Sequence, residues 1–289
     1  MTPPLNQLAS LRVRPCITDD YSLEVTVGDI PGLAQVAKTL PPSAQIAIPF
    51  LPTDDKAARV AAIRAVRQLG FEPVPHFAAR RITSASAFDG FMTETVAGGG
   101  ITRCFVVAGD PPHPLGPFPD SASLIATGAF ERCGVNTIGI GGHPEGHPVM
   151  SEAECWAVLE SKCRSIEERG MSPMIVTQFA FDADIVLRWL DGLRERGLHH
   201  PVRIGVPGPA GVATLMRFAA QCGVGASTAI LAKYGISATR LLGTSGPEKF
   251  VDRLAAGLRN GHGTVRLHFY PFGNIGKTVD WISHYASTR

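Results

Sequence analysis

Two carboxylates in this chain stand at positions where a charge has chemical consequences. Glu24 lies inside an apolar run, between Leu23 and Val25. An unpaired charge there is costly, so burial should raise the pKa of this carboxyl toward the range that a general acid needs at neutral pH. Asp110 follows a second apolar run, 103–108, and precedes two prolines that stop a strand. The sequence therefore predicts two carboxylates delivered by buried strands.

Three further polar side chains stand at the ends of apolar segments: His76, His147 and Gln178. In a barrel of parallel strands the chemistry is built at the carboxyl ends of the strands, so polar residues there predict a site. A single strand-end carboxylate or amide can instead cap the following helix, and that alternative stays open for each residue taken alone.

The elements that must position these side chains alternate between strands and helices. Apolar runs predict eight strands, at residues 21–27, 44–50, 71–77, 103–108, 137–142, 173–179, 202–206 and 264–270. Helical periodicity and capping residues predict helices at 31–40, 56–69, 84–97, 122–133, 151–169, 182–196, 211–222, 226–257 with a break near 243–246, and 275–285. Eight such units predict an α/β fold, a single-domain (β/α)8 TIM barrel over 1–289 with an N-terminal extension at 1–20; a doubly wound open sheet is the alternative.

Composition bounds the class of protein. The chain has 289 residues, 45% of them hydrophobic, and a formal net charge of +2, so it can bury a large core and has no field that implies nucleic acid. No signal peptide or membrane-spanning apolar stretch is apparent, which predicts a cytosolic protein. The six cysteines form no C-x-x-C pair, which predicts reduced structural thiols and no metal site.

Seven short motifs then occur in order between Tyr21 and Trp281. They are Tyr21-Ser22-Leu23-Glu24, Pro75-His76, Gly109-Asp110-x-Pro112, His143-Pro144-Glu145-Gly146-His147-Pro148, Thr177-Gln178-Phe179-x-Phe181-Asp182, Pro207-Gly208 and His268-Phe269-Tyr270. Each is weak alone, but their order and spacing resemble the flavin-dependent methylenetetrahydrofolate reductases.

The resemblance implies a (β/α)8 barrel that holds FAD at the carboxyl ends of its strands. NADH or NADPH would deliver hydride to the flavin and leave, and methylenetetrahydrofolate would then take hydride in the same place to give 5-methyltetrahydrofolate. Folate and nicotinamide are thus the implied small-molecule partners, with no nucleic acid or membrane, and a homo-oligomer is compatible with the resemblance.

The same resemblance assigns roles to individual residues. Glu24 matches the acid that assists opening of the folate ring, and Asp110 matches the carboxylate between flavin and pterin. Positions matching substrate contacts are Gln178, Phe218 and Asn274, and positions matching FAD contacts are Pro49, His76, Gly109, Asp110, His147, Lys162 and Arg164. For Lys162 and Arg164, a solvated helix surface is an equal alternative.

The chain departs from the family pattern at several binding positions. Ala108 stands where the family usually has an arginine before the Gly-Asp pair, which predicts a loosely held FAD because charge-assisted contacts are among the strong ones. His143 replaces a tyrosine, Thr214 replaces a glutamine, and the arginine expected after Asn274 is absent. Lys277 is a hypothetical substitute for that arginine; an unchanged folate affinity in a Lys277→Ala variant would dismiss it.

Two other classes of function fit the same strand-end residues. One is a flavin-free barrel enzyme that uses Glu24 and Asp110 as acid and base, and the other is a non-catalytic barrel that binds folate. The physiological direction of a reductase, reductive or oxidative, is set by cellular supply.

Overall fold

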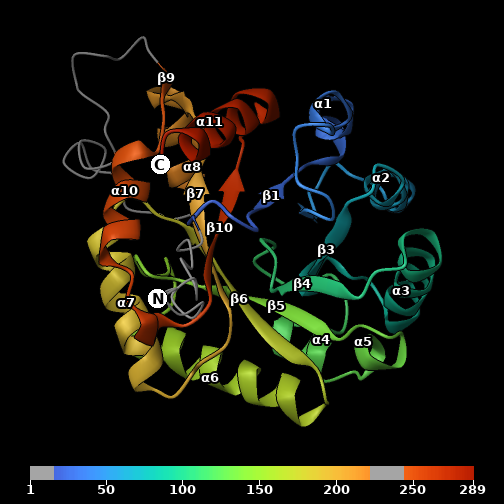
Figure 1. The fold of residues 1–289 in the computed structure, drawn as a ribbon. Coiled ribbons are helices and arrows are strands. Elements are labelled where there is room, and N and C mark those ends of the chain that lie inside the picture. Colours follow the sequence, from blue (N-terminus) through green and yellow to red (C-terminus); the bar gives the residue numbers. More distant parts are fainter. Residues whose placement is uncertain (1–15, 222–243) are drawn as a thin grey trace, which may run out of the picture.

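The computed structural model describes residues 16–221 and 244–289. Within them eight parallel strands close into a barrel (Figure 1), with the hydrogen-bonded order β1, β10, β7, β6, β5, β4, β3, β2. The predicted (β/α)8 barrel is confirmed and the open sheet is excluded. The barrel strands are β1 (Ser22–Glu24), β2 (Gln45–Ile48), β3 (Glu72–Ala78), β4 (Arg103–Val107), β5 (Thr137–Gly142), β6 (Ser172–Phe179), β7 (Val202–Pro207) and β10 (Val265–Tyr270).

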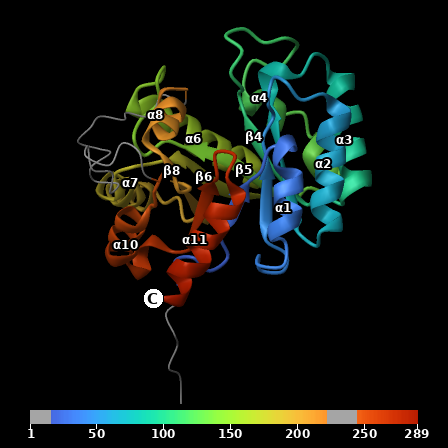
Figure 2. The same ribbon diagram turned by 90° about the horizontal axis from the view of Figure 1, so that it is seen from above.

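Helices surround the barrel on its outside (Figure 2). They are α1 (Ile30–Val36), α2 (Lys56–Gln68), α3 (Ala85–Gly99), α4 (Ser121–Ile125), α5 (Ala129–Arg132), α6 (Glu152–Glu168), α7 (Ala183–Glu195), α8 (Val212–Gln221), α10 (Glu248–Gly257) and α11 (Ile275–Ser287). Within the described ranges, no helix is both long and apolar enough to cross a membrane.

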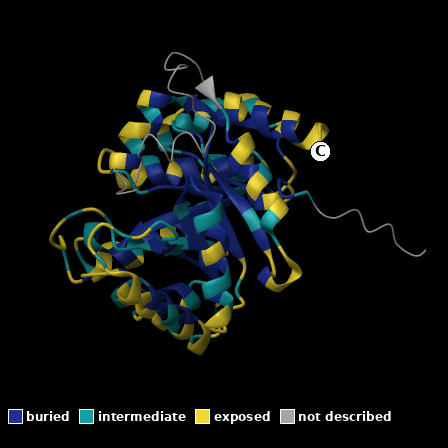
Figure 3. Ribbon diagram, turned by 90° about the vertical axis from the view of Figure 1, so that its left-hand side faces the viewer, coloured by how far each residue is buried: buried dark blue, intermediate teal, exposed yellow. Residues whose placement is uncertain are grey.

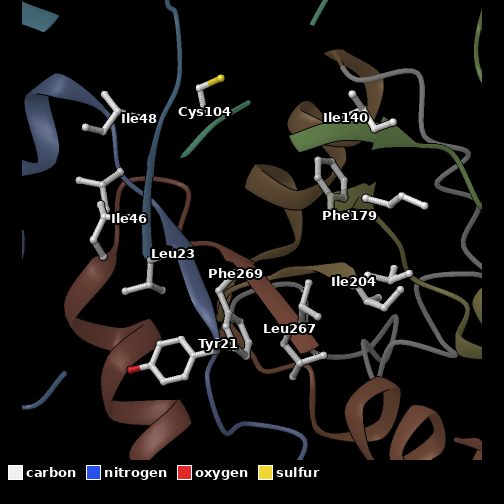
Figure 4. Packing of buried hydrophobic residues seen from close by; sticks show 14 of the residues in the cluster. Tyr21, Leu23, Ile46, Ile48, Cys104, Ile140, Phe179, Ile204, Leu267 and Phe269 are labelled. Carbon is white, nitrogen blue, oxygen red and sulfur yellow. The ribbon is translucent and has the colours of Figure 1, made fainter. Parts of the chain in front are cut away.

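The hydrophobic core lies between the barrel and this ring of helices. Alternate strand residues point outward into it and are fully buried, among them Leu23, Ile46, Ile204 and Leu267 (Figure 4). The helices cover the strands with their buried faces and expose the opposite ones (Figure 3). Because side chains alternate along a strand, the residues between these apolar positions face the barrel interior. Glu24 is one of them, which places a carboxyl inside the barrel.

The structure differs from the sequence-based expectation at three places. β1 is only three residues long, because a 3-10 helix, η1 (Val27–Asp29), begins where an extended strand was expected. The expected helix 122–133 is divided into α4 and α5, since Gly128 has φ +73 and breaks the helical path. An antiparallel pair, β8 (Ala210–Gly211) with β9 (Thr244–Ser245), was not expected.

Some expectations concern parts of the chain that the structure does not describe. Most of the N-terminal extension, Cys222 and the expected helical region 226–243 lie outside the described residues. The other five cysteines, Cys16, Cys104, Cys133, Cys155 and Cys163, are free thiols. Residues 16–221 and 244–289 contain no group of three or more His, Cys, Asp or Glu side chains that could hold a metal ion.

Candidate active site

Glu24 stands at the end of β1, close to a buried histidine. Its Oε2 lies 4.0 Å from Nε2 of His76, and its side chain keeps 23% of its surface exposed. Burial, followed by the negative charge of Asp29, raises the pKa of Glu24 to about 7. A carboxyl with this pKa is partly protonated at neutral pH, so it can donate a proton to a ligand at the barrel mouth.

His76 is held in place from outside the barrel by a buried guanidinium. Nη2 of Arg59 donates a hydrogen bond to the main-chain oxygen of His76, and the Arg59 Cζ lies 3.6 Å from the ring centre of Phe50. Burial, with the charge of Arg59 as a second cause, lowers the pKa of His76 to about 3. The imidazole beside Glu24 is therefore neutral at physiological pH.

Asp110 is paired with an arginine that the sequence analysis did not single out. Its Oδ1 accepts from Nε of Arg81 at 2.8 Å, and its Oδ2 accepts from Nη2 at 2.6 Å. Arg81 is largely buried, with 14% of its side chain exposed, whereas Asp110 is 68% exposed. Two parallel charge-assisted bonds fix the carboxylate in one orientation. Asp110 is thus not an isolated anion but half of a neutral pair.

Arg80 fastens the loop that carries Asp110. Its main-chain N–H donates to the oxygen of Ala108 at 2.8 Å, and its Nε donates to the oxygen of Pro119 at 2.7 Å. The one signal that could have revealed both arginines is their position directly after β3, where a strand reaches the functional end of a barrel. The position of Ala108 lacks a cation, but Arg81 brings one to the neighbouring carboxylate.

The expected cation pair on α6 divides between the two sides of the helix. Lys162 is buried, with 8% exposure, and Arg164 is exposed. The charge of Lys162 contributes to lowering the pKa of both His143 and His147, so it lies on the side of the loop after β5. Lys162 forms no hydrogen bond or ion pair with any other residue of the described ranges. Arg164 does not share its environment.

The remaining positions matched to cofactor contacts lie where parallel strands end. Gly109 has φ +91, and a Cβ there would lie 3.2 Å from the Cβ of Ala78, so a side chain would be strained. Pro49 is buried directly after β2. His147 packs edge to face against His143, with ring centres 4.8 Å apart.

Residues matched to substrate contacts are engaged locally in this structure. Gln178 Oε1 accepts from the main-chain N–H of Phe179 at 3.0 Å. Phe218 stacks on Phe272 with ring centres 4.2 Å apart. Asn274 caps α11, since its Oδ1 accepts from the main-chain N–H of Lys277 at 3.3 Å, and the Lys277 side chain is exposed. Asn274 therefore serves as the N-cap of α11 in this structure.

Glu145 connects two of the loops at this end of the barrel. Its Oε1 accepts from the main-chain N–H groups of Phe181 and Asp182 at 2.9 and 3.0 Å. It thereby ties the loop that carries His147 to the segment that follows Gln178. The sequence contained this residue in a motif, but only the structure shows what it holds.

We expect Glu145→Ala to lower the free energy of unfolding by about 2 kcal/mol, because two buried N–H groups lose a charged acceptor. Urea denaturation measures this change. Glu168→Ala is the matched control, since Glu168 is exposed and its side chain forms no hydrogen bond or ion pair with the described residues; its loss should change stability by less than about 0.5 kcal/mol. Equal effects of the two substitutions would contradict the role of Glu145.

A protein-family model decides the family. The model described as "Methylenetetrahydrofolate reductase" matches residues 51–282. The chain belongs to this family. Methylenetetrahydrofolate reductase (NADH) 1 of Arabidopsis thaliana is 25% identical over 203 residues, which is 64% of this chain and 33% of that protein. The protein of the same name from Zea mays is 27% identical over 125 residues, 39% of this chain and 21% of that protein. The matches thus cover a third or less of the length of these relatives.

A likeness to solved structures concerns the fold. The crystal structure of dihydropteroate synthase from Thermus thermophilus superposes with a TM-score of 0.50 at 13% identity, covering 93% of this chain and 94% of that chain. It agrees with the closed barrel and carries nothing about activity.

Some candidate residues lie outside the segment that the family model matches. The matched segment begins at residue 51, so Glu24 and Pro49 lie before it. Asp110, His147, Lys162 and Gln178 lie inside it. The roles of all these residues in this reductase-family protein are therefore predictions that rest on their geometry.

Proposed function

We propose that this protein interconverts 5,10-methylenetetrahydrofolate and 5-methyltetrahydrofolate, with FAD as cofactor and NADH or NADPH as the hydride donor. The observation that carries the proposal is Glu24, an acid with a pKa of about 7 inside the mouth of a barrel from this reductase family. The alternative function is that of a flavin-free enzyme or a non-catalytic folate-binding protein that uses the same residues at the barrel mouth.

The residues at the mouth fit a cofactor that carries phosphate groups. The Lys162 side chain is buried and forms no hydrogen bond or ion pair with the described residues; burial lowers its pKa, and the charge of Asp120 opposes this shift only in part. Such a group is stabilised when an anion reaches it. Gly109 has no side chain to obstruct a close approach to the backbone. Lys162, His147, Gly109 and the Asp110–Arg81 pair are the residues that would hold FAD, and FAD supplies the hydride chemistry.

The protein side chains then divide the remaining work. Glu24 would protonate the folate nitrogen that departs when the five-membered ring opens. The carboxylate of Asp110 would face the developing cation and stabilise it. The positive charge of Arg81 would partly offset this attraction and so set its size. Gln178 can donate to or accept from either flat substrate, and Phe218 can stack on one. A single site alternating between two aromatic substrates needs such adaptable contacts.

Spectroscopy of the purified protein tests this proposal. We expect a yellow protein whose flavin absorbance is bleached by NADH or NADPH and restored by methylenetetrahydrofolate under anaerobic conditions. If FAD is lost on purification, adding it back should restore both steps. A protein that neither binds FAD nor consumes a reduced nicotinamide would favour the flavin-free alternatives.

The Asp110–Arg81 pair gives a further prediction. Asp110→Asn should slow the folate-dependent step by at least about 10-fold and the nicotinamide step much less, because only the folate becomes cationic. Arg81→Ala should weaken FAD binding, measured by flavin fluorescence, since it frees the loop that carries Gly109. The rate of the folate-dependent step is also measured in Arg81→Ala and in the double variant. If the free-energy changes of the two single substitutions simply added in the double variant, they would contradict a functional pair, because the effects of coupled residues are not additive.

A further inference from the structure

The interior of the barrel carries a column of polar side chains. Barrels of this kind usually fill their interior with branched aliphatic residues. Here a small cavity inside the strands is bordered by six polar residues: Ser22, Gln45, His76, Arg203, His268 and Tyr270. Ser22, His76, Arg203 and His268 are all buried, with 9% exposure or less. A buried polar row along the barrel axis requires an explanation beyond packing.

At its lower end this column reaches solvent on the amino-terminal face of the barrel. Nη1 of Arg203 donates to the main-chain oxygen of Asp20 at 2.7 Å. Asp20 lies two residues before β1, and its side chain is 64% exposed. Above this contact, Ser22 Oγ lies 2.8 Å from Nδ1 of His268. Arg203, Ser22 and His268 border the same cavity, so the exposed end at Asp20 and the buried imidazole belong to one polar lining.

At its upper end the column reaches Glu24. His76 borders the same cavity as His268, and Nε2 of His76 lies 4.0 Å from Glu24 Oε2. The cavity has a volume of about 20 Å³, which is enough for about one water molecule. Gln45 borders it, and its Oε1 is buried without a partner among the described residues. A cavity with an unpaired acceptor suits a water that connects the two histidines.

We propose that this column, from Asp20 through His268 and His76, returns a proton to Glu24 from the amino-terminal face of the barrel. The inference rests on the proposed function, in which Glu24 gives its proton to the folate. A cofactor and a flat substrate at the mouth would cover Glu24 from the side of bulk water. A route through the barrel lets the acid be recharged while the ligands stay in place.

The transfers balance without any charged intermediate on the histidines. Glu24 carboxylate takes the ring proton of His76, His76 takes one from the cavity water, and the water takes one from His268. His268 takes the hydroxyl proton of Ser22, and Ser22 takes one from a water that would enter beside Asp20, the exposed group at this end. Burial lowers the pKa of both imidazoles, so each stays neutral and only exchanges its tautomer. Asp29 next to Glu24 and Arg59 behind His76 are the other charged groups that act on this end of the column.

Single-turnover kinetics of the FAD-loaded, reduced enzyme tests the relay. At pH 6 Glu24 is already protonated, so His268→Gln should reoxidise with methylenetetrahydrofolate at the wild-type rate. At pH 8.5, 1.5 units above the Glu24 pKa of about 7, only about 3% of molecules start with the proton in place. The wild type should still reoxidise in one phase. His268→Gln should show a small fast phase, and the remaining molecules should reoxidise at least about 10-fold more slowly than the wild type at the same pH.

Two further variants keep the test decisive. Ser22→Ala removes one hydroxyl only. It should also slow reoxidation at pH 8.5, and the double variant Ser22→Ala/His268→Gln should be no slower than His268→Gln alone. His262→Gln is the matched control, because His262 is a buried histidine that bonds Asp191 outside the barrel; it should behave as wild type at both pH values.

The outcomes separate the relay from the reductase itself. Equal slowing of His268→Gln at pH 6 and pH 8.5 would indicate a structural role and overturn the relay. A His268→Gln trace identical to wild type at pH 8.5 would overturn it as well, while leaving the reductase intact. A wild type that transfers no electrons from nicotinamide to folate overturns the proposed function, and the relay with it.

Discussion

Glu24→Gln is expected to abolish turnover of methylenetetrahydrofolate while flavin reduction by NADH or NADPH continues. Glutamine keeps the shape and polarity of the side chain but has no acidic proton to give to the folate nitrogen. General acid catalysis typically contributes about 10²–10⁴-fold, so the folate-dependent reoxidation of flavin should slow by about that factor. Stopped-flow absorbance resolves the two half-reactions. Equal losses in both would exclude the acid role.

The pH dependence of the wild type follows from the same group. Burial and Asp29 raise the pKa of Glu24 to about 7, so the acid is present below pH 7 and is lost above it. In a variant that cannot return the proton to Glu24, such as His268→Gln, the amplitude of the fast single-turnover phase should fall as pH rises, with a midpoint at the Glu24 pKa. Asp29→Asn removes the second cause and should move the midpoint downward without changing the rate at low pH.

Stability should respond in the same pH window. The folded protein holds a proton on Glu24 up to about pH 7, whereas the unfolded chain releases it near the ordinary carboxyl pKa. The native state therefore binds more protons in between, and stability falls as pH rises through this window. The effect is at most about 3 kcal/mol, reduced by the 23% exposure of the side chain. Glu24→Gln should remove this slope in thermal unfolding curves.

Lys162→Met is expected to weaken FAD binding by roughly 30-fold, or about 2 kcal/mol, as for the loss of one charge-assisted contact. The same change should leave the FAD-free protein at least as stable as wild type. The Lys162 side chain is buried, and the attraction of Asp120 offsets only part of the burial that lowers its pKa; a poorly compensated cation disfavours the folded state. Titration of FAD by fluorescence and thermal unfolding of the FAD-free protein measure the two effects.

Arg164→Met provides the matched control for this prediction. It removes a cation two residues away on the same helix, but from an exposed side chain. FAD affinity should change by less than about threefold, since exposed cations contribute little to a distant contact. If the two variants lost affinity equally, the effect would come from overall charge and not from a contact at Lys162. A destabilised FAD-free Lys162→Met protein would show that the lysine has a structural partner.

Local sequence patterns were sufficient to predict the barrel architecture and the polar residues near the ends of its strands. Alternation of strands and helices predicted the closed barrel, and the apolar neighbours of Glu24 predicted its raised pKa. These features depend on residues close together in the chain, whose periodicity and burial are legible directly. The expected helix 151–169 agrees with α6, whose start is capped by Ser151 and Glu154 in a local Ser-x-x-Glu pattern. The break at Gly128 was not legible in the sequence, because one glycine inside a helical pattern has no fixed outcome.

Only the tertiary structure decided which groups meet. Arg81 and Asp110 are 29 residues apart, and nothing in their local sequences pairs them. Lys162 and Arg164 look equivalent in the sequence, yet the packing of α6 against the barrel buries one and exposes the other. The distance between Glu24 and His76, and the polar column below them, depend on the register of strands closed into a ring. The sequence by itself determined the barrel and its reactive side chains, because periodicity and burial are local; the pairing that sets their charges came from contacts distant in the chain.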